Sequence, residues 1–389
     1  MAVQLPLHAK ENRSFNLKRD EQVDPVFLFL ILLLLLLGLA MLYSASYAQS
    51  LYDTGYEIST RYLQKQAVCG VLGLAAMYFV SRIPVSFWYR WAWPAYFMSI
   101  LLLLSVLLFG QKVNGARRWI NIAGIRFQPS EVAKFTLILI LARLTRNFGS
   151  RAETFRFGVL GFSLAILGIL LPLAAEKHLS AIMLMGMVAV TMMFVAGTGV
   201  KWLLGGAAAA AVFAGIYISL MGYAGDRVTA WLHPEQDPSD TGYQILQSLY
   251  AIGSGGLFGL GFGKSRQKYL YLPFQYNDYI FPVICEELGL VGAVSLMVLF
   301  SAMILRGYWI ALRARDRFSC VLSAGLVTLM ALQTILNLSV VSNILPSTGI
   351  SLPFFSYGGT ALAMNLAEMG VVLQISRGRN RGRLQEEKP

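Results

Sequence analysis

Long apolar runs separated by short polar stretches dominate this sequence of 389 residues. Roughly 20 apolar residues in a helix cross a hydrocarbon core about 30 Å thick, and the backbone polar groups of such a segment must bond to one another. The runs are continuous rather than alternating, which excludes a β-barrel. They predict an all-α polytopic membrane protein with ten transmembrane helices. The expected spans are residues 25–46, 62–81, 87–109, 131–147, 157–175, 179–199, 202–223, 279–305, 318–342 and 355–376.

The composition agrees with this interpretation and divides the chain into three parts. Hydrophobic residues make up 56% of it and charged residues 13%, with a mean hydropathy of +0.59. The first span is too long for the apolar core of a signal peptide, so we expect it to stay as an anchor. Residues 1–24 then form a cytoplasmic arm, residues 25–376 the membrane domain, and residues 377–389 a basic cytoplasmic tail.

The placement of positive charge predicts the orientation. Ten spans put both termini on one side, and the net charge is +12. With the termini in the cytoplasm, most arginines between spans fall on the inner side, as the positive-inside rule requires. The arginine-rich tail would then contact anionic lipid. The longest loop, residues 224–278 between the seventh and eighth spans, becomes extracytoplasmic.

Two outer segments break that rule. The first, residues 111–130, is expected to lie on the membrane surface, and the second lies near the end of the long loop. Positive charge kept outside against the insertion bias indicates an anionic ligand at headgroup level, such as a diphosphate, since guanidinium groups match phosphate oxygens. The alternative is simple snorkelling at the interface. The cations are Lys112, Arg117, Arg118, Arg126, Lys264, Arg266 and Lys268.

Charged residues also open the fourth span. Ser130 is expected to cap this helix at its N-terminus. Glu131 and Lys134 follow three residues apart, so they share one helix face. A carboxylate and an ammonium this close to lipid should pair, either to orient the helix or to line a polar cavity.

Two uncharged features of the outer loops carry structural expectations. Six glycines between residues 253 and 263 do not match a phosphate-binding loop, because no GxxxxGK[ST] pattern is complete. We expect them to allow close approach of the backbone to a ligand or another helix. Residues 343–359 are rich in proline and glycine and are predicted to fold as a re-entrant loop that lines a cavity.

The cysteines and histidines indicate no metal site. There are three of each, with no CxxC and no HExxH pattern. We therefore expect no bound metal, no tightly bound cofactor and no nucleic-acid partner.

The most informative acid is Asp278, which lies between the long loop and the eighth span. An ionisable group at the edge of the hydrocarbon is costly and needs a reason. One candidate reason is catalysis as a general base. The other is an N-cap for the helix that begins at Tyr279.

Four segments together resemble the SEDS proteins (shape, elongation, division and sporulation). They are NGARRWI…FQPSEVAK, YQILQSLYAIGSGGLFGLGFGKSRQKYLYLP, NDYIFPVICEELG and NILPSTGISLPFFSYGG. The resemblance covers nearly all of residues 25–376. The SRQKYLYLP stretch and the polar arm are more similar to the division branch, FtsW, and its sporulation relative than to the elongation branch, RodA.

The resemblance implies a peptidoglycan glycosyltransferase that polymerises lipid II into β-1,4 glycan at the outer face of the bacterial inner membrane, at the division septum. It implies a class B penicillin-binding protein as transpeptidase partner, other division proteins, and an undecaprenyl-linked glycan chain as product. Asp278 matches the family's essential acid, and an inverting displacement makes it the general base. A Mg²⁺ or Mn²⁺ ion can arrive with the diphosphate. The matching site residues are Arg117, Arg118, Glu131, Lys134, Ser356 and Gly358, with Lys264 and Lys268 as further diphosphate ligands.

One segment departs from the family, and other functions stay open. Many members carry Pro-Asp-Leu/Phe-Gly-Thr after the fifth span, where this chain has AEKHLS at residues 175–180. The expected acid is absent there, although Glu176 is close. The alternative functions are a lipid II flippase, a scaffold of the division machinery, and a sporulation homologue that makes cortex peptidoglycan.

Overall fold

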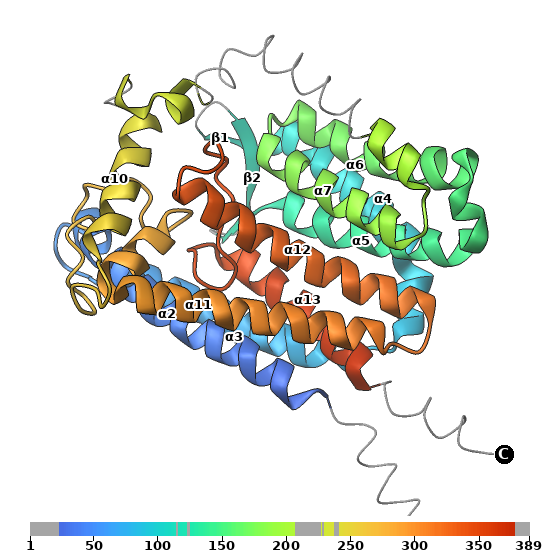
Figure 1. The fold of residues 1–389 in the computed structure, drawn as a ribbon, viewed down its shortest axis with the longest axis horizontal. Coiled ribbons are helices and arrows are strands. Elements are labelled where there is room, and N and C mark those ends of the chain that lie inside the picture. The colour runs from blue at the N-terminus through green and yellow to red at the C-terminus, as the bar shows by residue number, and fades with distance from the viewer. Residues whose placement is uncertain are drawn as a thin grey trace, which may run out of the picture.

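The structure is a computed structural model, and it describes residues 23–113, 116–122, 125–206, 227, 229–236 and 241–377. Within these ranges the chain is mostly helical (Figure 1). Nearly all of the expected N-terminal arm, the tail beyond Arg377, and most of the expected span 202–223 lie outside the described residues.

Each of the other nine expected spans coincides with a helix. Among the described residues, six helical segments are long and apolar enough to cross a membrane on their own: α2, α3, α4, α11, α12, and α6 together with the π-helical turn that precedes it at residues 155–161. The helices are α2 (Pro25–Asp53), α3 (Arg61–Val80), α4 (Val85–Phe109), α5 (Pro129–Phe148), α6 (Phe162–Ala175), α7 (Leu179–Val195), α10 (Thr241–Ser254), α11 (Ile280–Leu312), α12 (Arg317–Val341) and α13 (Gly359–Arg377).

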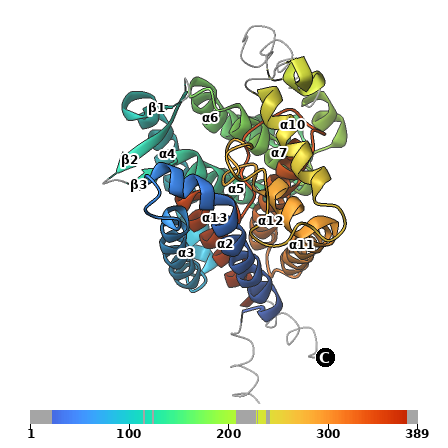
Figure 2. The same cartoon turned by 90° about the vertical axis from the view of Figure 1, so that its left-hand side faces the viewer.

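Two of the less apolar helices, α5 and α13, have most of their residues buried in the bundle. Helix α5 is buried along most of its length, and α4, α7 and α12 pack against it. Helix α13 packs against α3, and α11 lies between α2 and α12 (Figures 1 and 2). Interior helices face protein rather than lipid, so they tolerate polar side chains such as Lys134 and Glu368.

The two ends of the described chain meet at one end of the bundle. The backbone N–H of Asp24 donates to Ser376 Oγ at 3.0 Å. The carboxylate of Asp24 caps α2 through Phe27 N and pairs with Arg306 at 2.8 Å. A chain whose ends lie together in this way crosses the bundle an even number of times.

Three short strands between residues 111 and 127 form a small sheet, so the all-α prediction is incomplete. Strands β1 (Gln111–Val113), β2 (Ala116–Ile122) and β3 (Ile125–Phe127) pair antiparallel in that order. We expected this segment to lie along the membrane surface and did not foresee that its strands pair with one another. Trp119, Ile120 and Ile122 are aromatic or β-branched, a composition that favours a strand.

The long loop between the expected seventh and eighth spans also contains a helix that the sequence analysis did not predict. In α10, Ile245, Ser248 and Ala251 are fully buried at a spacing of three residues. Ser248 Oγ donates to the carbonyl of Val341 at the end of α12, at 2.6 Å. Helix α10 is therefore a packed element beside α11 and α12 rather than free loop (Figure 2).

Candidate active site

Helix α11 is broken at Gly289, which adopts φ 66° and ψ −167°. Residues 280–287 before the break are buried in protein, whereas several side chains after it are exposed. The backbone groups freed by the break bond to the glycine-rich loop: Leu290 N and Val291 N donate to the carbonyls of Gly256 and Leu257 at 2.9 and 3.1 Å. The carbonyls of Glu286 and Glu287 accept from Leu260 N and Gly261 N. The expected span 279–305 thus consists of two helical pieces that meet at Gly289, where the glycine-rich loop bonds to the freed backbone groups.

The glycines make this pairing possible, as the sequence analysis predicted. A Cβ on Gly255 would lie 2.0 Å from the carbonyl oxygen of Cys285, and one on Gly259 would lie 2.1 Å from that of Glu287. Gly259 also has a φ of +75°, which side chains rarely adopt. The predicted close approach of this segment to a helix is confirmed.

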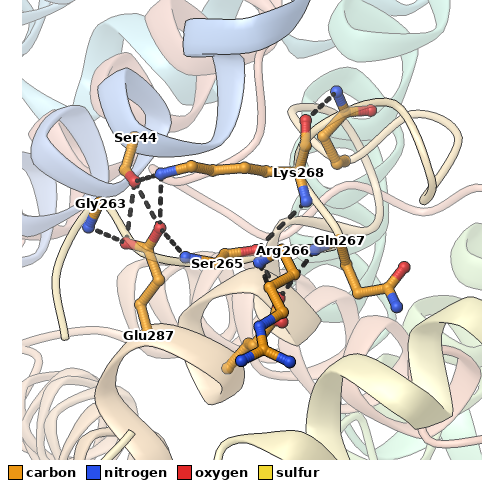
Figure 3. A network of polar contacts seen from close by, with 9 residues as sticks. Ser44, Gly263, Ser265, Arg266, Gln267, Lys268 and Glu287 are labelled. Atoms are coloured by element: carbon orange, nitrogen blue, oxygen red, sulfur yellow. Dashed lines mark hydrogen bonds and ion pairs between the residues drawn. The ribbon is translucent and has the colours of Figure 1, made fainter. Parts of the chain in front are cut away.

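Two buried carboxylates at the break hold the rest of the loop (Figure 3). Glu287 accepts from Gly263 N at 2.9 Å, and Glu286 accepts from Arg266 N at 3.0 Å. Lys268 Nζ lies 2.9 Å from Glu287 Oε1 and donates to Ser44 Oγ on α2 at 3.0 Å. Lys268 is only 2% exposed. Its ammonium is thus directed into the protein, whereas Lys264 is exposed and lines a surface depression with Arg266 and two tyrosines, Tyr269 and Tyr271.

Asp278 lies two residues before α11, but it is not the cap of that helix. The N-cap position is Tyr279, and no side chain caps the helix there. The alternative prediction of an N-cap aspartate is therefore wrong. Burial raises the pKa of Asp278 to about 6, while its own backbone N–H and the charge of Arg227 act in the opposite direction.

Two residues of the loop before α13, Gly349 and Ile350, are linked to Asp278, and the two residues before them are bonded to other elements. Asn337 Nδ2 donates at 2.7 Å both to the carbonyl of Asp278 and to that of Ile350. A Cβ on Gly349 would lie 3.5 Å from Asp278 Oδ2. The other two are held from further elements: the carbonyl of Ser347 accepts from Arg227 Nη1 at 2.9 Å, and that of Thr348 accepts from Ser180 Oγ. We call residues 347–350 the Ser347–Ile350 loop.

Arg117 and Arg118 leave β2 on opposite faces, as consecutive strand residues do. Arg117 is exposed and donates to the carbonyl of Leu107 at the end of α4, at 2.7 Å. Arg118 is half-buried and donates to the carbonyl of Lys177, at 2.6 Å, in the turn between α6 and α7. The structure therefore directs the two guanidinium groups expected to act together toward different neighbours.

The turn that departs from the family pattern lies beside Arg118. Burial raises the pKa of Glu176 to about 8, and the charge of Arg118 offsets part of that effect. Burial and the charges of Arg118 and Lys134 lower the pKa of His178 to about 3, so the imidazole is neutral. Two residues later, at the start of α7, Ser180 Oγ donates to the carbonyl of Thr348 in the Ser347–Ile350 loop. The turn thus connects Arg118 with the surroundings of Asp278.

Glu131 and Lys134 form the expected pair, with Lys134 Nζ 2.8 Å from Glu131 Oε2. Both side chains are nearly buried. The predicted capping role of Ser130 is wrong, since Gln128 is the N-cap of α5 and Pro129 starts the helix. Proline suits the first helical position because it lacks an N–H to satisfy.

Ser356 and Gly358 lie at the end of the re-entrant loop, where Gln66 of α3 holds both. Gln66 Nε2 donates to the carbonyl of Ser356 at 3.0 Å, and Gly358 N donates to Gln66 Oε1 at 3.1 Å. Ser356 Oγ accepts from Leu352 N at 2.8 Å. Both residues therefore shape the loop that leads to Asp278.

Sequence reasoning missed Arg227, Asn337, Ser180 and Gln66. Asn337 and Gln66 carried a signal, because an amide inside an apolar span has to find a partner. The sequence around Arg227 gave no signal that distinguishes it from other arginines in loops. Within the described ranges, no three side chains of the metal-ligating types cluster closely enough to hold an ion.

Known proteins share this sequence and fold. A peptidoglycan glycosyltransferase FtsW, described as probable, from Geobacter metallireducens is 37% identical over 94% of this chain and 97% of its own length. Stage V sporulation protein E of Bacillus subtilis is 35% identical over 87% of this chain and 93% of its own. The rod shape determining protein RodA of Thermus thermophilus, seen by crystallography, superposes with a TM-score of 0.69 at 27% identity, covering 92% of this chain and 98% of its own.

A chain of a solved peptidoglycan synthase complex superposes with a TM-score of 0.78 at 28% identity, covering 92% of this chain and 99% of its own. That structure is described as showing the coordination of polymerization and crosslinking. The sequence profile of the cell cycle proteins FtsW, RodA and SpoVE matches residues 25–381. This chain, a multi-pass membrane protein with Asp278 beside the loop before α13, belongs to that cell cycle protein family.

Proposed function

We propose that this protein is a peptidoglycan glycosyltransferase that polymerises lipid II during cell division. Relatives named as peptidoglycan glycosyltransferases align along nearly the whole chain, and the members most similar in sequence include FtsW proteins. The observation that supports the chemistry best is the placement of Asp278. Its carboxylate does not cap α11, and it faces a loop held by side chains of several other elements.

The reaction joins C1 of one sugar to the 4-hydroxyl of another with inversion. Asp278 accepts the proton of the attacking hydroxyl, and the C1–O bond to the diphosphate breaks as the new glycosidic bond forms. A base with a pKa near 6 is ionised at neutral pH and still accepts a proton.

The leaving diphosphate needs stabilisation of charge more than a proton. Arg118 and Arg117 supply fork-shaped donors on β2, and Lys264 supplies an exposed ammonium. We leave Lys268 out of this set because its ammonium is buried against Glu287. A divalent cation can accompany the diphosphate and add charge there.

The remaining groups shape the cavity. The pair Glu131–Lys134 lies at the start of the interior helix α5, and Lys134 also acts electrostatically on His178. Ser356 and Gly358 set the course of the re-entrant loop through Gln66.

The cellular setting follows the same proposal. We place the protein in the bacterial cytoplasmic membrane at the division septum, with ten spans, both termini in the cytoplasm and residues 224–278 outside. The meeting of the two described ends at one end of the bundle supports an even number of crossings. The likeness to a chain of a peptidoglycan synthase complex supports a class B penicillin-binding protein as partner.

The test is polymerisation of lipid II by the purified protein with its transpeptidase partner. Wild type should make glycan chains, and Asp278→Asn should make none while keeping its thermal unfolding profile. Glu235→Gln changes an exposed acid of the same outer segment and serves as the matched control. Normal polymerisation by Asp278→Asn would overturn the mechanism. No glycan from wild type, together with lipid II transfer across vesicles, would favour a flippase instead.

A further inference from the structure

Arg227 is held against the Ser347–Ile350 loop by its position on a short helical segment. The segment contacts that loop region twice, four residues apart, as one helix face does. Arg227 Nη1 donates to the carbonyl of Ser347 at 2.9 Å, and Trp231 Nε1 donates to the carbonyl of Asn343 at 3.1 Å. In return, Asn343 Nδ2 donates to the carbonyl of Trp231 at 3.4 Å. The outer segment after α7 is thus docked onto the loop before α13.

The loop position that Arg227 holds is two residues from the one that touches the carboxylate. Gly349 lies against Asp278 Oδ2 so closely that even a Cβ would be in contact. From the other side, Asn337 of α12 ties the backbone of Asp278 to Ile350. A displacement of Ser347 therefore moves the backbone that lies against the carboxylate of Asp278.

Arg227 also contributes charge. The groups around Asp278 from the other elements are neutral: the amide of Asn337 from α12, the backbone of Gly349 from the loop, and the phenol of Tyr279. Among the described residues, Arg227 is the cation whose field reaches the carboxylate noticeably. A positive charge nearby favours the ionised form of an acid.

We propose that Arg227 is a positioning residue for the glycosyl transfer, holding the Ser347–Ile350 loop against Asp278 and presenting its positive charge to that carboxylate. This inference rests on the proposed function, because it gives Arg227 a role through the base. It adds Arg227, near the start of the long loop, to a centre built from Asp278 at the end of that loop, Asn337 of α12 and the loop before α13. A protein segment that docks on Arg227 or Trp231 would thereby affect the position of Asp278.

The test is the pH dependence of kcat/KM for lipid II polymerisation in wild type, Arg227→Gln, Arg227→Lys and Trp231→Phe. Arg227→Gln should move the acid limb upward by about 1 pH unit and lower the rate at pH 6.5. Arg227→Lys keeps the charge and should leave the limb in place. Trp231→Phe breaks the second docking contact without changing charge, so it controls for mere loosening of the segment.

Two results would overturn the proposal. One is an acid limb of Arg227→Gln that coincides with wild type, and the other is an equal displacement in Trp231→Phe. If Arg227→Gln does not fold, Arg227→Met keeps the length and apolar stem and takes its place. Asp278→Asn is measured beside them: if it is inactive while Arg227→Gln has a normal profile, only the role of Arg227 fails. If Asp278→Asn is active, the proposed mechanism fails with it.

Discussion

Asn337 of α12 donates its side-chain N–H to the backbone carbonyl of Asp278 at 2.7 Å, and the same nitrogen donates to Ile350 at 2.7 Å. Asn337 is 1% exposed. One buried amide thus joins the residue before α11 to the loop before α13, which are 72 residues apart in sequence.

Replacing that amide should affect both stability and catalysis. Asn337→Leu leaves two carbonyls without their donor, which costs about 1–3 kcal/mol for each buried group. We expect a lower thermal midpoint and a lower polymerisation rate, measured on the same detergent-purified sample. Gln333→Leu is the matched control, because Gln333 is buried one turn earlier on α12 and its side-chain oxygen has no hydrogen-bond partner. Equal losses in both variants would contradict a special role for Asn337.

The pairing between the glycine-rich loop and the break in α11 can be tested by adding one methyl group. Gly259→Ala places a Cβ 2.1 Å from the carbonyl oxygen of Glu287, and backbone would have to move. We expect poor expression or a thermal midpoint lowered by several degrees. Gly263→Ala has a similar φ of +78° but open space around its Cβ, so it should lose only about 1 kcal/mol from backbone strain. If Gly259→Ala and Gly263→Ala have the same thermal midpoint, position 259 does not require glycine for close approach.

The Lys268–Glu287 pair should behave as a buried ion pair. Removing one partner strands the other charge, so Lys268→Met should lose about 3–5 kcal/mol of stability. The double variant Lys268→Met/Glu287→Gln should recover part of that loss. Thermal unfolding of the two single variants and the double variant closes the cycle. Lys264→Met, an exposed neighbour, should change the midpoint little; strictly additive losses in the cycle would show that the pair is not coupled.

The pH dependence of the wild-type rate reports the base. A carboxylate whose pKa is near 6 is protonated, and therefore inactive as a base, below that pH. Polymerisation should fall as the pH drops through about 6 and stay level between pH 7 and 8, measured as initial rates with a pH-independent readout of glycan. A rate that stays constant down to pH 5 would mean that the group accepting the proton is not Asp278.

The long apolar helices were predicted correctly, because local pattern decides their structure. Apolar runs such as residues 25–46 and 318–342 predicted helices that the structure contains, because backbone groups in hydrocarbon can bond only within their own segment. The sheet of residues 111–127 and helix α10 were missed, because short amphipathic segments in outer loops depend on what they pack against.

The sequence by itself determined the membrane class, the position of most helices and Asp278 as the candidate base. Only the tertiary structure decided which charges face the site, because contacts between different elements depend on how helices pack and not on spacing. It joined Lys268 to Glu287 and Ser44, separated Arg117 from Arg118, and brought Arg227 to the loop beside Asp278. The partner of a cation depends on burial and geometry in the folded protein, and the order of residues alone gives neither.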